Sequence, residues 1–205
     1  MLEAIALDCT RGGRALFRGL SFGLGAGELL RVAGANGSGK TSLVRILCGL
    51  LSPTAGEVRW QGTPIARLRE EFSRQLVYLG HAPAVKDDLS AAENLSISCT
   101  LAGLAVSEAA VREALARFGL PADDVPVRRL SQGQRRRAAL ARLCLSQRIA
   151  CWFLDEPFAA LDADALGVTE ALIGQHVAQG GGVIYTTHQD TGIGGARVIA
   201  LGTAG

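Results

Sequence analysis

The stretch Gly34-Ala-Asn-Gly-Ser-Gly-Lys-Thr41 decides the fold, because it fills every fixed position of the pattern GxxxxGK[ST]. Apolar residues 29–33 precede it and helix-forming residues 42–50 follow it, which is the strand–loop–helix context that this pattern needs. Its glycines can take backbone angles closed to other residues, so successive N–H groups turn toward phosphate oxygens at the start of a helix. The stretch therefore predicts a phosphate-binding loop.

The side chains of the loop suit the same ligand. Lys40 is placed to reach the β and γ phosphates of a nucleotide, and the Thr41 hydroxyl suits Mg²⁺, a hard ion that prefers oxygen. The predicted nucleotide-binding residues are Gly34, Ala35, Asn36, Gly37, Ser38, Gly39, Lys40, Thr41 and Ser42. A glycine-rich turn with a merely solvated lysine is the alternative, and the flanking strand and helix disfavour it.

Composition limits the class of protein. With 205 residues and 48% hydrophobic content, the chain can bury one good core and a small subdomain, but not two full domains. A net charge of +2 gives no sign of nucleic-acid binding. The five cysteines are widely spaced and form no CxxC pair, which is typical of reduced, mostly buried thiols in a cytosolic protein. Since no signal peptide or run of 18 apolar residues occurs, we expect any membrane role to depend on a partner.

Periodicity predicts strands alternating with helices. Strands are expected over residues 2–8, 16–24, 29–33, 57–61, 75–80, 150–154 and 183–187, and helices over 42–50, 131–146 and 163–179. Two further helices are expected to begin at Ser90, which forms a capping box with Glu93, and at Ser107. The prediction is a single α/β domain over residues 1–205, with a mainly parallel sheet, N-terminal antiparallel strands and a helical subdomain inserted over about 82–145.

Two motifs place titratable side chains at the ends of predicted strands. In Cys151-Trp-Phe-Leu-Asp155-Glu156 a buried strand delivers Asp155 to its carboxyl end, where it can hold Mg²⁺ through the ion's hydration shell. Glu156 is the best candidate for the general base that polarises the attacking water, although two solvated acids remain the alternative. His188, in Thr186-Thr-His188, is the histidine placed at a strand end, whereas His176 falls within a predicted helix.

A further peptide, Leu130-Ser-Gln-Gly-Gln134, completes an ordered motif set by which the chain resembles the ATP-binding cassette (ABC) ATPases. Their signature peptide is LSGGQ, so Gln132 replaces a glycine. Over nearly the whole chain, the resemblance implies the P-loop NTPase fold of an ABC nucleotide-binding domain, with ATP and Mg²⁺ as ligands. It also implies an ATP-dependent homodimer, in which the signature peptide of one copy closes over the γ-phosphate held by the other. The residues carried over are Ser131, Gln132, Gly133 and Gln134 for the signature, His188 for the switch and Asp162 for the D-loop along the dimer seam.

Some residues near these motifs have no settled role. Arg135, Arg136 and Arg137 extend the positive end of the signature helix, or Arg135 and Arg136 are simply solvated on its surface. His81 stands where the family's Q-loop usually has glutamine. It acts either through water or as a coupling contact, or it is a loop histidine with no metal role.

The nucleobase site departs from the family as well. Thr10 to Arg14 offers no aromatic residue where the family usually stacks adenine. Arg11 or Arg14 could stack instead, or the nucleobase selectivity is loose.

Within the family, the chain resembles the ATP-binding subunits of bacterial haem exporters used in cytochrome c maturation. This resemblance is carried by Gly80-His81, Trp60-Gln-Gly62, residues 130–137, residues 155–162 and Thr186-Thr-His-Gln189. It implies a peripheral ATPase, or translocase subunit, on the cytoplasmic face of the inner membrane, with separate membrane-spanning subunits and haem-handling partners.

Two other readings stay open. An ABC transporter subunit for a drug, lipid or peptide is the nearest rival. A nucleic-acid-associated ABC ATPase is less favoured, because Lys40 and Ser131 lie only 91 positions apart and leave no room for a long coiled coil. A non-enzymatic binding module would be expected to lack Glu156.

Overall fold

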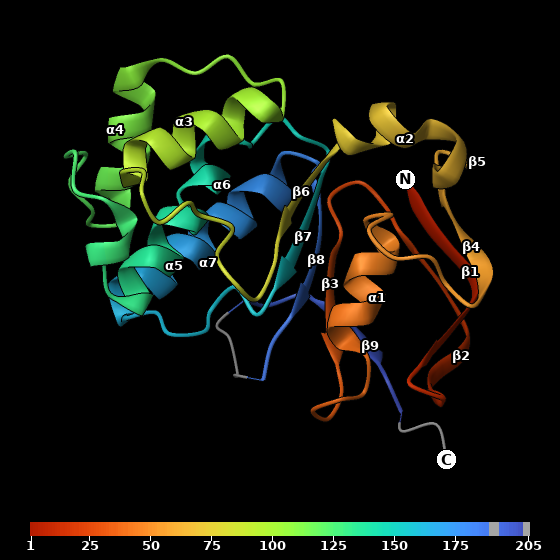
Figure 1. Cartoon of the computed structure of the whole chain (residues 1–205). Helices are drawn as coiled ribbons and strands as arrows, with labels where there is room; N and C mark the ends of the chain where they lie inside the picture. Colours follow the sequence, from red (N-terminus) through yellow and green to blue (C-terminus); the bar gives the residue numbers. More distant parts are fainter. Residues whose placement is uncertain (189–192, 203–205) are drawn as a thin grey trace.

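A computed structural model describes residues 1–188 and 193–202, and this part of the chain forms two sheets (Figure 1). The antiparallel sheet has the order β2 (Arg14–Leu24), β1 (Leu2–Arg11), β4 (Ala55–Trp60) and β5 (Thr63–Pro64). The parallel sheet has the order β6 (Leu76–Leu79), β7 (Cys151–Asp155), β8 (Gly182–Thr186), β3 (Leu29–Ala33) and β9 (Arg197–Ala200). The predicted fold class, a mainly parallel core with N-terminal antiparallel strands, is therefore confirmed.

Helix α1 (Lys40–Leu47) lies between the two sheets, and most other helices cover the far face of the parallel sheet (Figure 1). Side chains of β7 alternate between the two cores. Trp152 and Leu154 pack on the helical side, while Cys151 and Phe153 pack on the side of α1. Because β7 is buried on both faces, its sequence is an uninterrupted apolar run ending in Asp155.

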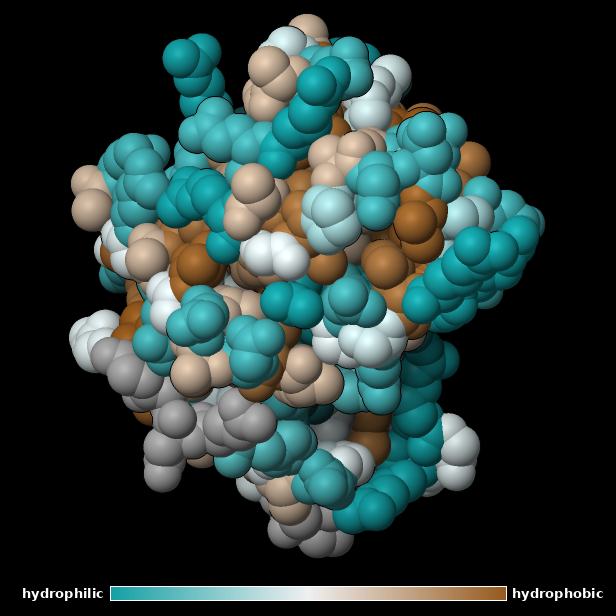
Figure 2. Space-filling model, turned by 90° about the vertical axis from the view of Figure 1, so that its left-hand side faces the viewer, coloured by the Kyte–Doolittle hydropathy of each residue, from teal (hydrophilic) through white to brown (hydrophobic). Residues whose placement is uncertain are grey.

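The helical side contains α3 (Ala91–Leu101), α4 (Glu108–Arg117), the short 3₁₀ helix η1 (Val127–Arg129), α5 (Gln132–Leu140), α6 (Arg142–Leu145) and α7 (Ala163–Ala178). Ser90 and Ser107 cap α3 and α4 as predicted, and Ser90 forms the full capping box with Glu93. Figure 2 views this side and shows apolar areas interspersed with polar side chains. Leu101 of α3 is 84% exposed.

Some predicted element bounds were wrong. The single helix expected over residues 131–146 is two helices, because the Cys144 N–H bonds to the carbonyl of Ala141, one residue short of the α-helical spacing. The helix expected over 42–50 begins at Lys40 and ends before Gly49, which adopts φ +73°. Helix α2 (Ile65–Ser73) and strand β9 were not predicted. Within the described ranges, every helix is too short or too polar to cross a bilayer.

His176 of α7 is part of the helical-side core. His176 is 1% exposed. Its ring stacks on that of Trp152, with the ring centres 3.9 Å apart and the planes 2° from parallel. Nδ1 lies 3.2 Å from the carbonyl oxygen of Gln147. Burial lowers the pKa of His176 to about 4, because the cationic ring would lose its hydration. The imidazole is therefore held in its neutral form.

All five cysteines, each within the described residues, are free thiols, and only Cys144 is partly exposed. Burial raises the pKa of every one of them: Cys9, Cys48, Cys99, Cys144 and Cys151. The expectation of mostly buried thiols is confirmed.

Candidate nucleotide site

The phosphate loop connects β3 to α1. Lys40 is buried, and its Nζ donates to the carbonyl oxygens of Gly34 at 2.8 Å and Ala35 at 3.1 Å. Gly34 has φ +155°, and a Cβ there would lie 2.5 Å from Ser38 Oγ and 2.9 Å from the carbonyl oxygen of Leu201. A glycine is therefore required where the loop leaves the sheet.

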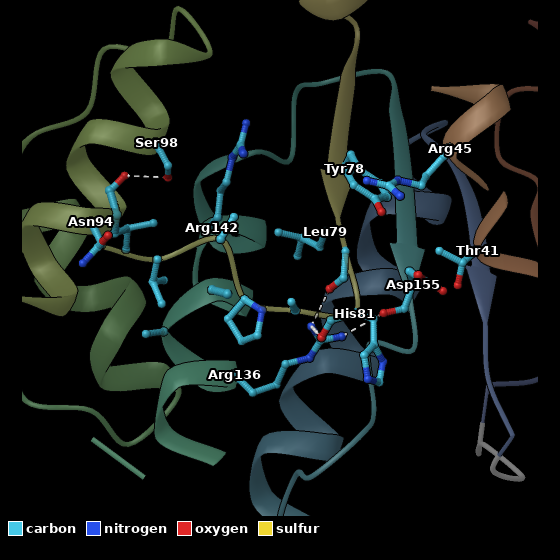
Figure 3. A pocket seen from close by; sticks show the side chains of 18 residues that line it. Thr41, Arg45, Tyr78, Leu79, His81, Asn94, Ser98, Arg136, Arg142 and Asp155 are labelled. Atoms are coloured by element: carbon cyan, nitrogen blue, oxygen red, sulfur yellow. Dashed lines mark hydrogen bonds between the residues drawn. The ribbon is translucent and has the colours of Figure 1, made fainter. Parts of the chain in front are cut away.

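Asp155 ends β7 and is 1% exposed. The Thr186 hydroxyl donates to Asp155 Oδ1 at 2.8 Å, and the same hydroxyl accepts the N–H of Glu156 at 2.8 Å. Asp155 Oδ2 is buried and has no hydrogen-bond partner among the described residues. Thr41 and Asp155 line one cavity of about 390 Å³ (Figure 3). The buried, unpaired Oδ2 of Asp155 and the hydroxyl of Thr41, which lines the same cavity, are the kind of oxygen ligands that a hard divalent cation prefers.

Glu156 adopts φ +54°, which is uncommon for a residue with a side chain. Its side chain is 15% exposed, and Oε1 lies 3.2 Å from Nε2 of His188. Both residues line a cavity of about 720 Å³ with Lys40, Thr41 and His81. The fold thus brings a carboxylate and an imidazole next to the phosphate loop, as the motif order predicts.

Arg136 is the site residue whose position the sequence did not reveal. It is 4% exposed, so the reading of Arg136 as a solvated surface arginine was wrong. Its guanidinium donates to the carbonyl oxygens of Gly80, His81 and Asp155, among the residues drawn in Figure 3, and to that of Glu156. The pKa of Arg136 is lowered, mainly because burial disfavours the charged guanidinium. The nearby carboxylates of Asp155 and Glu156 favour the charged form and offset part of this shift.

The neighbouring arginines of α5 make separate contacts. Arg135 lies 3.0 Å from Asp87 Oδ1, so it is paired rather than only solvated. Arg137 lies 3.4 Å from Asp162 Oδ2, and Asp162 also caps α7 by accepting the Ala165 N–H. The predicted D-loop residue is therefore held by its own chain.

The signature residues lie apart from the chain's own phosphate loop. Ser131 caps α5 and forms a capping box with Gln134: the Ser131 hydroxyl accepts the Gln134 N–H, and the Gln134 side chain accepts the Ser131 N–H. The side chain of Gln134 is therefore bonded to the start of its own helix. Gln132 is exposed, and a Cβ on Gly133 would lie 3.2 Å from the carbonyl oxygen of Ala160. Neither described cavity beside the phosphate loop is lined by any of these four residues.

The residues at the two positions where the sequence departs from the family pattern, the Q-loop position and the nucleobase site, lie at the edge of the nucleotide site. His81 is exposed, and it lines both cavities. Arg11 lines the 720 Å³ cavity together with Leu16, whereas Arg14 does not. Of the two arginines considered for the nucleobase, Arg11 is the one beside the phosphate loop. Gln189, part of the last motif quoted above, lies outside the described residues.

A phosphate loop, strand-end acids, a following histidine and a separate signature helix define an ATP-binding cassette ATPase of the P-loop class. Residues 17–159 match the family model described as ABC transporter, and the chain belongs to this family. It is an ATPase that binds ATP.

Curated relatives share the family and most of the length. The cytochrome c biogenesis ATP-binding export protein CcmA of Aromatoleum aromaticum is 56% identical over 191 residues, which cover 93% of this chain and 89% of the relative. CcmA of Nitrosospira multiformis is 48% identical over 201 residues, covering 98% and 97%. A putative bifunctional cytochrome c-type biogenesis protein, CcmAE, of Salmonella choleraesuis is 51% identical over 189 residues, which cover 92% of this chain but 55% of that protein.

Solved structures share the fold. A dimeric post-hydrolysis state of the ATP-binding cassette MJ0796, bound to ADP and Pi, has a TM-score of 0.83 at 24% identity and covers 98% of this chain and 94% of that chain. A putative ABC transporter ATP-binding protein from Pyrococcus furiosus has a TM-score of 0.82 at 23% identity, covering 98% and 96%.

Proposed function

We propose that the chain is the ATP-hydrolysing subunit of an exporter for c-type cytochrome biogenesis, and that the species exported or delivered is haem. The observation that carries this proposal is 56% identity, over 93% of the chain, to a protein named for cytochrome c biogenesis and export. Haem is favoured as the cargo because it is the group that a c-type cytochrome must receive.

Five residues carry the chemistry in this proposal. Lys40 binds the phosphates, while Thr41 and Asp155 hold Mg²⁺, which when bound offsets phosphate charge. Glu156 takes a proton from water as the water oxygen bonds to the γ-phosphorus and the bond to the ADP oxygen breaks. His188 contacts the γ-phosphate and helps orient that water. The 3.2 Å approach of Glu156 Oε1 and His188 Nε2 supports their joint action.

Each site is completed by a second copy of the chain. Ser131, Gln132, Gly133 and Gln134 of that copy face the γ-phosphate, where the start of α5 favours negative charge. Their separation from the chain's own phosphate loop supports this assignment. A nucleotide-bound crystal structure tests it, and residues 130–134 facing away from every γ-phosphate in any pairing of copies would contradict it.

Partners and location follow from the same proposal. The chain works on the cytoplasmic face of the bacterial inner membrane, with separate membrane-spanning subunits and with haem-handling proteins on the far side. Exposed Ile97 and Leu101 of α3 support a protein partner, because exposed apolar side chains on one helix are commonly buried in interfaces. The relative CcmAE, which is named a putative bifunctional cytochrome c-type biogenesis protein, supports a functional partnership with a second biogenesis protein.

The experiment is deletion and complementation in the host. Covalent haem in periplasmic c-type cytochromes is measured beside drug sensitivity. We expect haem attachment to be lost, to return with the wild-type gene and not with Glu156→Gln, and to return with Glu113→Gln, which changes an exposed acid of α4. Normal haem attachment with altered drug sensitivity would instead support another cargo, and nucleic acid in the purified preparation would support the nucleic-acid-associated class.

The catalytic role of Glu156 has its own test. Purified Glu156→Gln should hydrolyse ATP about 10²- to 10⁴-fold more slowly than the wild type while it retains ATP and accumulates as a dimer. Size-exclusion chromatography with ATP measures the dimer. A Glu156→Gln variant that stays monomeric with ATP, yet turns over at the wild-type rate, contradicts the proposed mechanism.

A further inference from the structure

The Arg136 guanidinium joins the ends of two neighbouring strands. It donates to Gly80 O at 2.7 Å and His81 O at 3.2 Å, which follow β6, and to Asp155 O at 3.0 Å and Glu156 O at 2.6 Å, which end and follow β7. Strands β6 and β7 pair in parallel as far as Leu79 and Leu154. One side chain from α5 thus donates to four carbonyl groups just where the strand pairing stops. Figure 3 shows Arg136 pointing toward the ends of the two strands.

Glu156 needs such support because of its backbone. A left-handed conformation is strained in a residue with a side chain and persists only when the surroundings enforce it. Its N–H donates to Thr186 Oγ1 at 2.8 Å, and its carbonyl accepts from Arg136 at 2.6 Å and from the Ala159 N–H at 3.2 Å. The peptide groups on both sides of the Glu156 Cα are therefore fixed, which sets the direction of its carboxylate toward His188.

The contacts of Arg136 are made with carbonyl oxygens rather than with the carboxylates of Asp155 or Glu156. A planar guanidinium with five donors can reach four acceptors in fixed directions, whereas a lysine ammonium has three donors and no fixed plane. A change to lysine keeps the positive charge and removes this geometry.

We propose that Arg136 and Thr186 are positioning residues that hold Glu156 in its left-handed conformation, Arg136 from its carbonyl side and Thr186 from its N–H side. This inference rests on the proposed role of Glu156 as the general base. Neither residue needs to touch the nucleotide, because both hold the Glu156 main chain, although the Thr186 hydroxyl also donates to Asp155 Oδ1.

The test is a kinetic double-mutant cycle with the chain assembled with its membrane subunits. The variants are Arg136→Lys, Glu156→Gln and the double variant, with Arg112→Lys as the matched control, since Arg112 is an exposed arginine of α4. We expect Arg136→Lys to lower kcat by about 10- to 100-fold, as misplacement of a catalytic group does. The KM for ATP should stay within about twofold, because the phosphate loop is unchanged. Arg112→Lys should keep both values.

The double variant is the decisive measurement. If Arg136 acts through Glu156, the double variant should be no slower than Glu156→Gln alone, because the base is already absent. Multiplied losses, a change confined to KM, or an unchanged kcat in Arg136→Lys would each overturn the inference. Wild type that fails to hydrolyse ATP, or Glu156→Gln that hydrolyses it normally, would instead refute the proposed function.

Thr186 keeps the inference testable if Arg136→Lys does not fold, which circular dichroism and thermal unfolding would show. Thr186→Val removes the hydroxyl with little change in shape, and Thr186→Ser keeps it. We expect Thr186→Val to lower kcat, and Thr186→Ser to restore kcat to within about threefold of the wild type. An unchanged kcat in Thr186→Val, or failure of serine to restore the rate, would overturn the inference.

Discussion

The buried pair of His176 and Trp152 should make the protein lose stability in mild acid. The pKa of His176 is about 4 in the folded chain against an ordinary 6.5. At pH values between these two, His176 is protonated in the unfolded chain but not in the folded chain. The free energy of unfolding therefore falls as the pH falls. Each pKa unit corresponds to about 1.4 kcal/mol, which gives a loss of about 2 kcal/mol at pH 5 and about 3 kcal/mol below pH 4. At pH 7 and above, where both states are neutral, this contribution is absent.

The assay is urea unfolding of the wild type and of His176→Phe between pH 7.5 and 4.5. Phenylalanine keeps an aromatic ring against Trp152 but cannot take up a proton. The variant loses the contact with the Gln147 carbonyl at every pH, so the informative quantity is how the difference in unfolding free energy changes with pH. We expect this difference to move by about 2 kcal/mol in favour of the variant from pH 7.5 to pH 5. A difference that stays constant across this range would refute the reasoning.

Three further substitutions test the nucleotide site. Gly34→Ala should weaken ATP binding about tenfold or more in equilibrium titrations, because the added Cβ would lie 2.5 Å from Ser38 Oγ. Its control is Gly167→Ala on α7, where the Cβ meets nothing within 4 Å and the helix should gain about 0.5 to 1 kcal/mol in thermal unfolding. Arg11→Ala should raise the Kd for ATP about threefold to tenfold in fluorescence titrations if its guanidinium stacks on the nucleobase, with Arg14→Ala close to wild type; equal effects would argue against stacking. His81→Gln should change the partner-stimulated rate of ATP hydrolysis if His81 is a coupling contact, and an unchanged rate would argue against that role.

The sequence predicted the elements whose residues are buried in a regular pattern. Strand β7 was found because it is buried on both faces, and α3 was found because Ser90 and Glu93 cap it. Strand β9 was missed because three of its four residues are exposed, so no apolar run or alternation marks it. These differences follow from burial rather than from intrinsic propensity.

The residues of the functional site were likewise predicted only in part. The groups proposed to meet ATP directly stand in motifs with fixed spacing, so their neighbourhood could be predicted. Arg136 could not be singled out, because it is the middle of three consecutive arginines that point in different directions around α5. Thr186 lies in a motif that was recognised, but its bond to Asp155 depends on the pairing of β7 with β8. Such contacts are set by tertiary structure and leave no local pattern.

The five native thiols, four of them buried and one partly exposed, have a practical consequence for measuring the motions of this molecule. A thiol reacts as its thiolate, and raised pKa values together with burial keep the native cysteines slow toward alkylating dyes. A cysteine introduced on the exposed surface of α4, for example at Glu113, should therefore take up a fluorophore first, with the native five left in place. Distances between two labelled copies would then test directly whether they approach each other when ATP is added, as proposed above.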